Sequence, residues 1–477
     1  MASHKIGDRI RAWGYDFTWT AEHMSPEQLH PLKYSYDVLA ADCLDRFDEL
    51  VPSLPLRSRS KPKTGSSSTE PAVQPGTESP ETTSCPHPDF YDLLQKHAPH
   101  DKTLRRLLDE VNTVPPWVDW AQIERGQKVF YRYAGPSIVS LTFHSLLGGM
   151  GARRVVETLT RTGGFGIKVA RRRLLETFQH VLDVSESLDA IKPGGRGFAS
   201  TLRVRFLHAS VQRRILRLAA RDPSYYDVSS LGIPISDLDA VSTALAFSAS
   251  TIWVGFPRQG IHLRPSEVAD YLALWRYVAY LLGTPDSFLS SPSLAKAAME
   301  SIVLAEVDPT TTSQILANNI ITALADKPPT YASADFLRAE ARWLNGSDLA
   351  DRLAVPRPPV YYTLLVAGQC LFFMVLCYVR RAVTSWDERG IARLRRILRD
   401  VTLDQMGGKE AMHAFRYLPE LGKLTTSVEE KDTDDKTFSG PFSRQGVERR
   451  NLVSVLVGLV GVGLATWLCG RLVTAVV

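Results

Sequence analysis

The stretch from Ser200 to Ala220 reads STLRVRFLHASVQRRILRLAA and has the apolar spacing of a helix. Four apolar residues form one stripe along it: Val204, Val211, Ile215 and Leu218. His208 falls on the same stripe, four residues after Val204 and three before Val211. The spacing therefore predicts a helix that turns an imidazole into the interior. A lone interior histidine is more often a hydrogen-bonded core residue than a ligand, although neutral imidazole is the commonest metal ligand.

A helix of this kind already carries most of what a haem site requires. One axial imidazole is sufficient, and apolar walls suit the faces of the porphyrin. Arg205 stands one turn before His208, and Arg213 follows it. Guanidinium groups in these places can pair with haem propionates through charge-assisted hydrogen bonds. This arrangement permits haem without requiring it.

A second segment, Ala152 to Phe178, reads ARRVVETLTRTGGFGIKVARRRLLETF. It predicts a helix that carries Thr158, Arg161 and Thr162 and ends at the glycine pair 163–164. Glycines there would let the backbone approach a flat ligand closely, which makes Thr158 a candidate cofactor-binding residue. The alternative, an ordinary helix C-terminus with basic residues that favour the helix dipole, stays open. His144, in the apolar run SIVSLTFHSLLGG, could line a pocket but is more simply expected to pack in the core.

The organisation along the chain predicts an all-α protein. Residues 1–52 show helical and aromatic signals and are expected to form a helical extension that packs on the main domain. Residues 53–86 are rich in Ser, Thr and Pro and are expected to be a disordered insertion. From 87 to 358 the apolar spacing is mostly helical, with little strand-like alternation. Residues 380–450 are expected to be a basic helical segment that turns polar from Thr425 to Gln445.

Two uncharged segments are long enough to cross a bilayer. Residues 452–470, LVSVLVGLVGVGLATWLCG, form the stronger candidate and predict a C-terminal transmembrane helix. Residues 360–379, VYYTLLVAGQCLFFMVLCYV, contain Gln369 and three tyrosines, so they predict either a transmembrane or a buried helix. If only the second segment spans, the main domain faces the cytosol. If both span, the positive-inside tendency places the basic stretch 380–450 in the cytosol and the main domain in the lumen.

Composition excludes several classes of protein. The net charge of +5 over 477 residues is too mild for a nucleic-acid binder. The five cysteines contain no CxxC pair, which argues against a disulfide framework or a structural zinc site. The glycine-rich pieces GGMG and GGFG do not match GxGxxG, and the chain has no HExxH, GxSxG or P-loop motif.

An ordered set of blocks resembles a known family. They are VPPWVDWAQIERGQKVFYRY (114–133), SLTFHSLLGGMGARRVVETLTRTGGF, PGGRGF with LRVRFLHASVQRR, LGIPISDLDAVSTALAFSAS, VADYLALWRYVAYLLGTP and LNGSDLADRLAVPRPP. In this order they resemble the catalytic domain shared by fungal ER-bound oxygenases, such as that of mycophenolic acid biosynthesis, and bacterial latex-clearing rubber oxygenases. The resemblance covers residues 110 to 358, and its most specific element is RxxHAxVxR.

The resemblance implies a globin-like helical core with one haem b and molecular oxygen as co-substrate. It makes His208 the proximal iron ligand and places Arg161 and Thr162 where rubber oxygenases carry a distal Lys-Thr pair. The chain departs from the family at Arg161, which replaces the lysine, and at Gln212, which replaces an arginine. The acidic residue that rubber oxygenases use as a base has no counterpart in GGMGARR. The resemblance therefore supports His208 as the iron ligand more strongly than it supports the rubber-cleavage reaction. Polyisoprene is not the expected substrate.

The leading hypothesis is a membrane-bound haem-dependent oxygenase of the endoplasmic reticulum. Its substrate would be a lipophilic molecule such as a prenyl or terpenoid compound, and its reaction would include oxidative C=C cleavage. Membrane lipid is the other expected partner. Two alternatives belong to other classes: a non-catalytic haem- or lipophile-binding membrane protein, and a purely structural helical membrane protein with His208 in its core.

Overall fold

A computed structural model of the chain describes residues 4–51, 89–162, 165–406 and 446–476. The expected disordered insertion, 53–86, and the polar end of the segment 380–450 lie outside these residues. The described chain is mostly helical, as predicted, and forms two compact units. One unit is Val38–Thr113, and the other combines Met1–Asp37 with Val114–Val477.

The smaller unit is a set of three helices, α2 (Val38–Leu50), α3 (Phe90–His97) and α4 (Lys102–Asn112), with a short 3-10 turn, η2 (Ala98–His100). Asp101 caps α4 by accepting hydrogen bonds from the amides of Thr103 and Leu104 at 2.9 and 3.0 Å. Arg46 of α2 donates to the same carboxylate at 2.8 Å. Helix α2 therefore packs against a helix that comes after residues 52–88, which lie outside the described residues.

The larger unit begins with a β-hairpin, β1 (Arg9–Ala12) and β2 (Tyr15–Thr18), followed by α1 (Pro26–Leu29) and η1 (His30–Lys33). Trp13 and Gly14 form its turn, both with positive φ (52° and 70°), as a type I′ turn requires. The helical expectation for residues 1–52 did not include this hairpin. Strands of four residues carry too little alternation to be recognised in the sequence.

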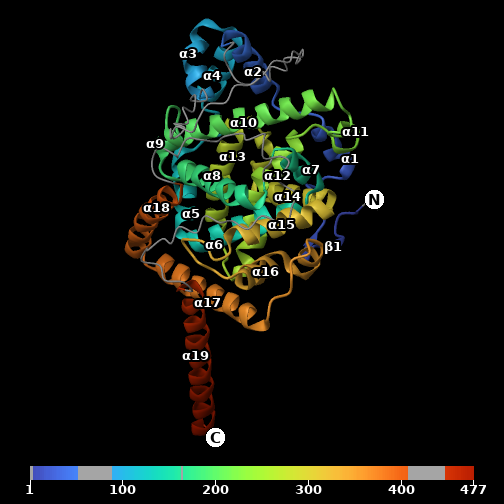
Figure 1. Cartoon of the computed structure of the whole chain (residues 1–477). Helices are drawn as coiled ribbons and strands as arrows, with labels where there is room; N and C mark the ends of the chain where they lie inside the picture. Colours follow the sequence, from blue (N-terminus) through green and yellow to red (C-terminus); the bar gives the residue numbers. More distant parts are fainter. Residues whose placement is uncertain (1–3, 52–88, 163–164, 407–445, 477) are drawn as a thin grey trace, which may run out of the picture. The chain divides into compact units, whose positions relative to one another are not determined.

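The main body of the larger unit is helical throughout (Figure 1). In chain order its elements are α5 (Trp120–Arg132), α6 (Ala134–Val139), η3 (Ser140–Leu147), η4 (Gly148–Gly151), α7 (Arg153–Arg161), α8 (Ile167–Ser185), α9 (Leu188–Ile191), α10 (Arg196–Ala219), α11 (Val228–Leu231), α12 (Asp237–Phe247), η5 (Thr251–Gly255), η6 (Pro257–Gln259), α13 (Pro265–Leu281), η7 (Asp286–Leu289), α14 (Pro292–Glu306), α15 (Thr311–Leu324), α16 (Ala334–Arg352), α17 (Val360–Ala382), α18 (Thr384–Met406) and α19 (Gly446–Val476). The segments η3 and η5 are π-helices, a form that is frequent at functional sites.

Close backbone packing joins α8 to the start of α10. A Cβ atom added at Gly197 would lie 2.5 Å from the carbonyl oxygen of Asp183, and one at Gly195 would lie 2.2 Å from that of Asp189. Between these glycines, Arg196 forms ion pairs with Asp183 at 2.9 Å and Glu186 at 2.6 Å. The motif PGGRGF therefore serves packing: Gly197 lets α10 lie against the C-terminal end of α8, Gly195 lets it lie against α9, and Arg196 adds ion pairs to the contact with α8.

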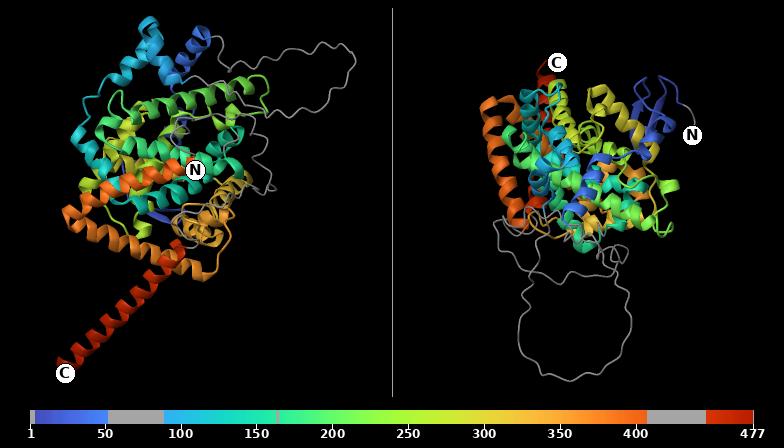
Figure 2. Two further views of the ribbon diagram at one scale, coloured as in Figure 1. Left: turned by 60° about the vertical axis from the view of Figure 1, so that its left-hand side comes forward. Right: turned by 90° about the horizontal axis from the view of Figure 1, so that it is seen from above.

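The three C-terminal helices are arranged differently from the body. α17 runs across the lower end of the body in Figure 1, α18 runs back along its side, and α19 projects away from it (Figures 1 and 2). Two described helical stretches are long and apolar enough to cross a membrane, Asp237–Gly255 and Val360–Ala382. The first is 61% buried and belongs to the core, whereas the second is 39% buried and keeps one exposed face.

We expect Gly197→Ala to lower the free energy of unfolding by about 1–3 kcal/mol, because the added methyl group meets backbone that cannot rotate away. Gly149→Ala is the matched control, since its methyl group would meet nothing within 4 Å. Thermal unfolding of the two variants measures the difference. Equal stabilities would contradict the close packing of α8 and α10.

Candidate active site: a histidine-lined apolar cavity

The centre of the larger unit contains a cavity of about 890 Å³. Its wall is mostly apolar and is contributed by η3, α7, α8, α10, α12 and later helices. Three imidazoles line it: His144, His180 and His208. A volume of this size is in the range of about 300–1,000 Å³ that is usual for cofactor and ligand pockets.

His208 lies on α10 as the sequence predicted, and Val204, Leu207 and Val211 line the cavity beside it. No hydrogen bond joins its ring to any residue that the structure describes. Burial lowers the pKa of His208 to about 4, against a weaker opposing effect of the Asp37 carboxylate. The imidazole is therefore neutral at physiological pH and has a ring nitrogen available as a ligand.

His180 of α8 is a second imidazole in the same wall. Its Nδ1 lies 3.2 Å from the hydroxyl oxygen of Ser200 on α10. Burial and the nearby charge of His208 lower the pKa of His180 to about 4. The sequence analysis missed this residue, because its place beside His208 depends on how α8 and α10 pack and not on spacing within either helix.

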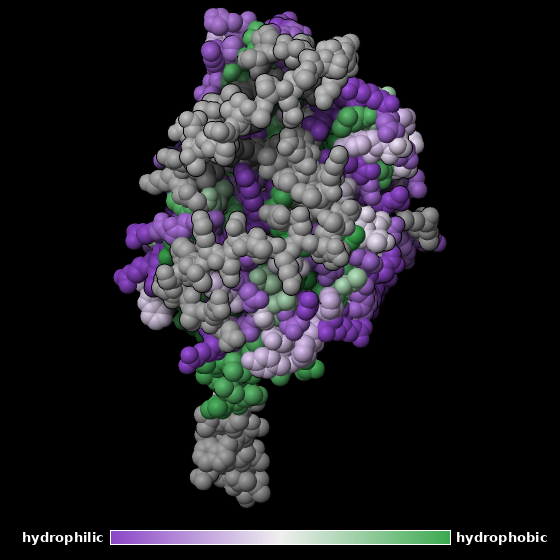
Figure 3. Space-filling view, viewed as in Figure 1, coloured by the Kyte–Doolittle hydropathy of each residue, from purple (hydrophilic) through white to green (hydrophobic). Residues whose placement is uncertain are grey.

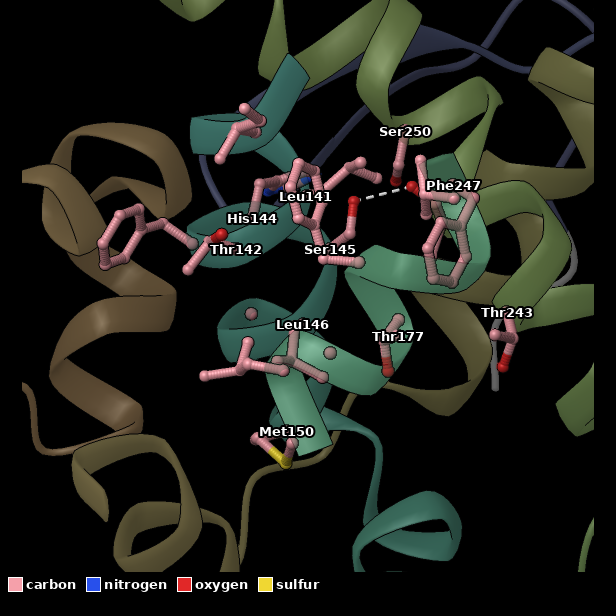
Figure 4. Close-up of a pocket in the computed structure, with 18 of the residues that line it drawn as sticks. Leu141, Thr142, His144, Ser145, Leu146, Met150, Thr177, Thr243, Phe247 and Ser250 are labelled. Carbon is pink, nitrogen blue, oxygen red and sulfur yellow. Dashed lines mark hydrogen bonds between the residues drawn. The ribbon is translucent and has the colours of Figure 1, made fainter. Parts of the chain in front are cut away.

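His144 lies on the π-helix η3 and lines the cavity with its neighbours Leu141, Thr142 and Ser145 (Figure 4). The dashed line in Figure 4 is the hydrogen bond that the Ser145 hydroxyl donates to the carbonyl of Ala246 at 2.6 Å. Of the two places that the sequence allowed for His144, the structure shows the pocket wall and not the core.

The tautomer of His144 follows from Asn345. The Asn345 side-chain amide donates to the carbonyls of Phe143 at 2.7 Å and Ala341 at 2.8 Å, so its oxygen is the acceptor that faces His144 Nδ1 at 3.2 Å. Nδ1 then carries the proton, and Nε2 carries the lone pair. Burial also lowers the pKa of His144 to about 4, which keeps the ring neutral.

Tight backbone geometry surrounds this pair. A Cβ atom at Gly148 would lie 2.2 Å from the Asn345 side-chain oxygen. Gly346, directly after Asn345, breaks α16 with a φ of 75° that favours glycine. Both glycines therefore help to hold Asn345 against His144.

The structure separates the two residues that were expected on the distal side. Thr162 lines the cavity, as does Thr158 one helical turn earlier. The Thr162 hydroxyl donates to the carbonyl of Leu159 at 2.8 Å, which leaves its oxygen as an acceptor toward the cavity. Arg161 is not among the residues of the wall. Its guanidinium pairs with Glu157 at 2.6 Å and donates to the carbonyl of Tyr225.

The two arginines expected to meet a cofactor also lie away from the cavity wall. Arg205 makes a two-pronged ion pair with Asp37, with nitrogen–oxygen distances of 2.6 and 3.0 Å. Arg213 is half-buried and is not among the residues that line the cavity. The cationic side chains that do line it were not singled out in the sequence: Arg171, Arg173, Arg258, Lys327 and Arg450. Arg258 and Arg450 form no ion pair with a described residue.

Carboxylates reach the cavity from several helices. The wall includes Glu176, Asp239, Glu300, Glu306 and Glu340. Most are paired: Glu306, for example, meets Lys33 at 2.7 Å, and Glu300 meets His23 at 2.9 Å. Glu340 has no basic partner within ion-pair distance in the described structure. Its carboxylate accepts a hydrogen bond from the amide of Gln369, whose own oxygen faces the Asn451 amide at 3.3 Å.

The residues present fit a haem better than a bare metal ion. Among the described residues, no group of three or more His, Cys, Asp and Glu could hold a metal ion together. A haem needs one imidazole, apolar walls and donors for its propionates. His208, the apolar lining and the cationic side chains of the wall supply these three requirements.

Comparison with known proteins gives the family. Residues 131–373, about half of the chain, match the family model described as ER-bound oxygenase mpaB/B'/Rubber oxygenase, catalytic domain. The chain belongs to this family, whose members are oxygenases, and the resemblance inferred from the sequence is confirmed.

Two individual proteins illustrate the relationship. The rubber oxygenase of Streptomyces sp. (strain K30) is 22% identical over 274 residues, which are 56% of this chain and 63% of that protein. The chain thus spans less than two thirds of the length of this curated relative. The structure of latex clearing protein LCP in the closed state superimposes with a TM-score of 0.54 at 17% identity, covering 80% of this chain and 92% of that chain. The helical fold is therefore shared.

Glu340 predicts a pH dependence of stability. Burial raises its pKa from 4.5 to about 7, so the folded state favours the protonated acid. Stability from this group is greatest below pH 4.5 and falls as the pH rises toward 7, by an upper limit of roughly 3 kcal/mol. Glu340→Gln should flatten the curve of unfolding free energy between pH 4.5 and 7.5. An unchanged curve would show that Glu340 ionises normally.

Proposed function

We propose that this protein is a membrane-bound haem-dependent oxygenase that acts on a lipophilic substrate, with oxidative C=C cleavage as the reaction. The observation that carries the proposal is His208. A neutral, half-buried imidazole with no hydrogen-bond partner in the described structure faces an apolar cavity, in a chain that belongs to an oxygenase family. A neutral ring nitrogen that bonds to nothing in the described chain is available to a ligand in the cavity.

The chain's own residues have distinct roles in this proposal. His208 would hold the haem iron, and the cofactor would supply the chemistry that activates molecular oxygen. Arg258 and Arg450 lack carboxylate partners in the described structure, so their positive charge would attract propionates or an acidic group of the substrate. Their guanidinium groups already donate hydrogen bonds: Arg258 to the carbonyls of Trp13, Gly14 and Leu344, and Arg450 to the Asn451 side chain. The apolar wall excludes water and accommodates a hydrocarbon chain.

Two polar side chains of the wall would act on the substrate. His144 presents its unprotonated Nε2 as a proton acceptor, a role that needs a neutral imidazole within reach of the reacting group. Thr162 offers an oxygen that accepts hydrogen bonds. Arg161, which was expected to act beside Thr162, would instead stabilise the end of α7 through Glu157 and Tyr225.

The membrane part of the proposal is supported by α19. This helix has 31 residues and, at 1.5 Å per residue, is about 45 Å long, which exceeds the roughly 30 Å of a hydrocarbon core. The family's description as ER-bound supports location in the endoplasmic reticulum membrane. A lipophilic substrate dissolved in that membrane would be close to the cavity.

A second candidate function is non-catalytic binding of haem or of a lipophilic molecule. The observation that favours it is the position of Arg161, because the cation expected on the distal side is engaged elsewhere. Oxygen consumption separates the two functions. Haem-loaded protein that consumes no oxygen with any member of a panel of prenylated compounds would support the second.

The haem ligand has a direct spectroscopic test. We expect the purified protein to show a Soret band that His208→Ala removes, because the variant deletes the axial imidazole. In His208→Gly, added imidazole should restore the band by occupying the vacated space.

The other two cavity histidines provide matched controls. His144→Ala and His180→Ala should retain the band, since neither is the proposed ligand. A protein that stays free of haem after haem supplementation would overturn the proposal. Loss of the band only in His180→Ala would move the ligand to α8.

A further inference from the structure

The outer side of α17 is an exposed apolar surface. Its exposed side chains are Val360, Tyr361, Leu364, Met374, Val375, Leu376 and Val379, with exposed fractions between 36% and 74%. Leu364, Val375 and Val379 lie on one side of the helix. They are separated by eleven and four residues, and both spacings are close to whole numbers of helical turns. We call this set of seven residues the α17 surface.

The anchor helix α19 leaves from the middle of the α17 surface. Gly368 is one turn after Leu364, and a Cβ atom there would lie 2.3 Å from the carbonyl oxygen of Asn451 in α19. Beyond this crossing α19 exposes its own apolar residues: Val453, Leu456, Val457, Leu459 and Val460. Figure 3 shows the hydrophobic residues gathered where α19 leaves the body. The exposed apolar residues of the two helices therefore form a continuous surface.

The inner side of α17 is attached to the body along its length. Leu365 is fully buried in the core, and Gln369 donates to Glu340. Near the C-terminal end, the Tyr378 hydroxyl donates to the carbonyl of Gly260 at 3.0 Å, and Arg381 donates to the Tyr133 hydroxyl at 3.0 Å. A helix that crossed a bilayer would have to carry these polar partners into the hydrocarbon, where unpaired or charged groups are strongly disfavoured.

Residues typical of a membrane interface border this surface. Trp386 in the first turn of α18 is 52% exposed. Arg389 in α18 and Arg449 in α19 are exposed and form no ion pair with a described residue. Tryptophan is enriched at the level of lipid headgroups, and exposed arginines near the apolar surface favour anionic lipids.

The cavity extends to the same three helices. Its wall includes Gln369 and Phe373 from α17, Leu398 from α18, and Val447 and Arg450 from α19. Helix α17 therefore has the cavity on its inner side and the α17 surface on its outer side.

We propose that α17 lies flat in the interface of a phospholipid bilayer with anionic headgroups and that α19 alone crosses the bilayer. The two backbones are in contact at Gly368, so we further propose that lipophilic molecules enter the cavity from the lipid beside this crossing, where Phe373 and Val447 line the wall. The proposal rests on the proposed membrane-bound function and adds the orientation and the route of entry. An amphipathic helix with one buried and one apolar exposed side is suited to the interface plane. Lateral entry would spare the substrate a passage through water.

Spin labels test the orientation in the full-length chain. Cysteines are introduced at Leu364, Val375 and Val379 after replacing Cys85 and Cys469, because the three described native cysteines are buried. In vesicles of phosphatidylcholine and phosphatidylserine, the three labels should collide more with oxygen than with a water-soluble nickel complex, and their depths should be similar. The matched control is Ile6→Cys, an exposed apolar position (73%) outside the proposed contact, whose label should favour the nickel complex.

Two outcomes would overturn the flat orientation. Depths that differ by roughly 20 Å between positions 364 and 379 would show that α17 crosses the bilayer. Labels that all favour the nickel complex would show that the α17 surface does not meet lipid.

Photolabelling tests the entry route. A phosphatidylcholine with a diazirine on its acyl chain should form adducts at Phe373 and Val447 inside the cavity as well as on the α17 surface. Val447→Trp should narrow the entrance and reduce the adducts at Phe373 several-fold while leaving those at Val375 unchanged. Adducts confined to the α17 surface would overturn the entry route. Neither test uses haem or turnover, so its failure is distinguishable from failure of the oxygenase proposal.

Discussion

The close packing of α8 against α10 is the contact on which the candidate site depends. Gly197 leaves no space for a side chain between the two backbones, and Arg196 joins them through ion pairs with Asp183 and Glu186. Because both helices are rigid, this one contact sets the position of His180, within one turn of Asp183, and that of His208, about three turns after Gly197. The cavity exists between helices whose spacing is fixed outside it, so the site does not need its own side chains to hold it open.

The polar groups of the cavity fall into two kinds. Most are satisfied inside the protein: Glu306 and Glu300 by basic partners, Thr162 by a helix carbonyl, and His144 by Asn345. The His208 ring has no hydrogen-bond partner in the described structure, and other buried polar atoms lack one too, among them the Thr158 hydroxyl of the same wall. Unpartnered polar groups that face a cavity are available to a molecule that is not part of the chain.

Local patterns in the sequence predicted what lies within one element and missed what lies between elements. The stripe on α10 predicted that His208 faces inward, and the helical spacing predicted the fold. Spacing within α7 did not reveal that Arg161 turns away from the cavity while Thr162 faces it, because Glu157 and the Tyr225 carbonyl draw the guanidinium outward. Arg205 likewise meets Asp37, 168 residues away, which no local pattern indicates. The roles of His144 and His180 required the positions of α16 and α10.

The contact between His144 and Asn345 also constrains how the family can diverge. Gly148 leaves room for the Asn345 amide, Gly346 permits the helix break beside it, and the amide orients the imidazole. A substitution at Gly148, Asn345, Gly346 or His144 would therefore break the arrangement that the other three residues serve. During descent they should behave as a single inherited character, kept together in homologues that retain the imidazole and lost together in those that do not.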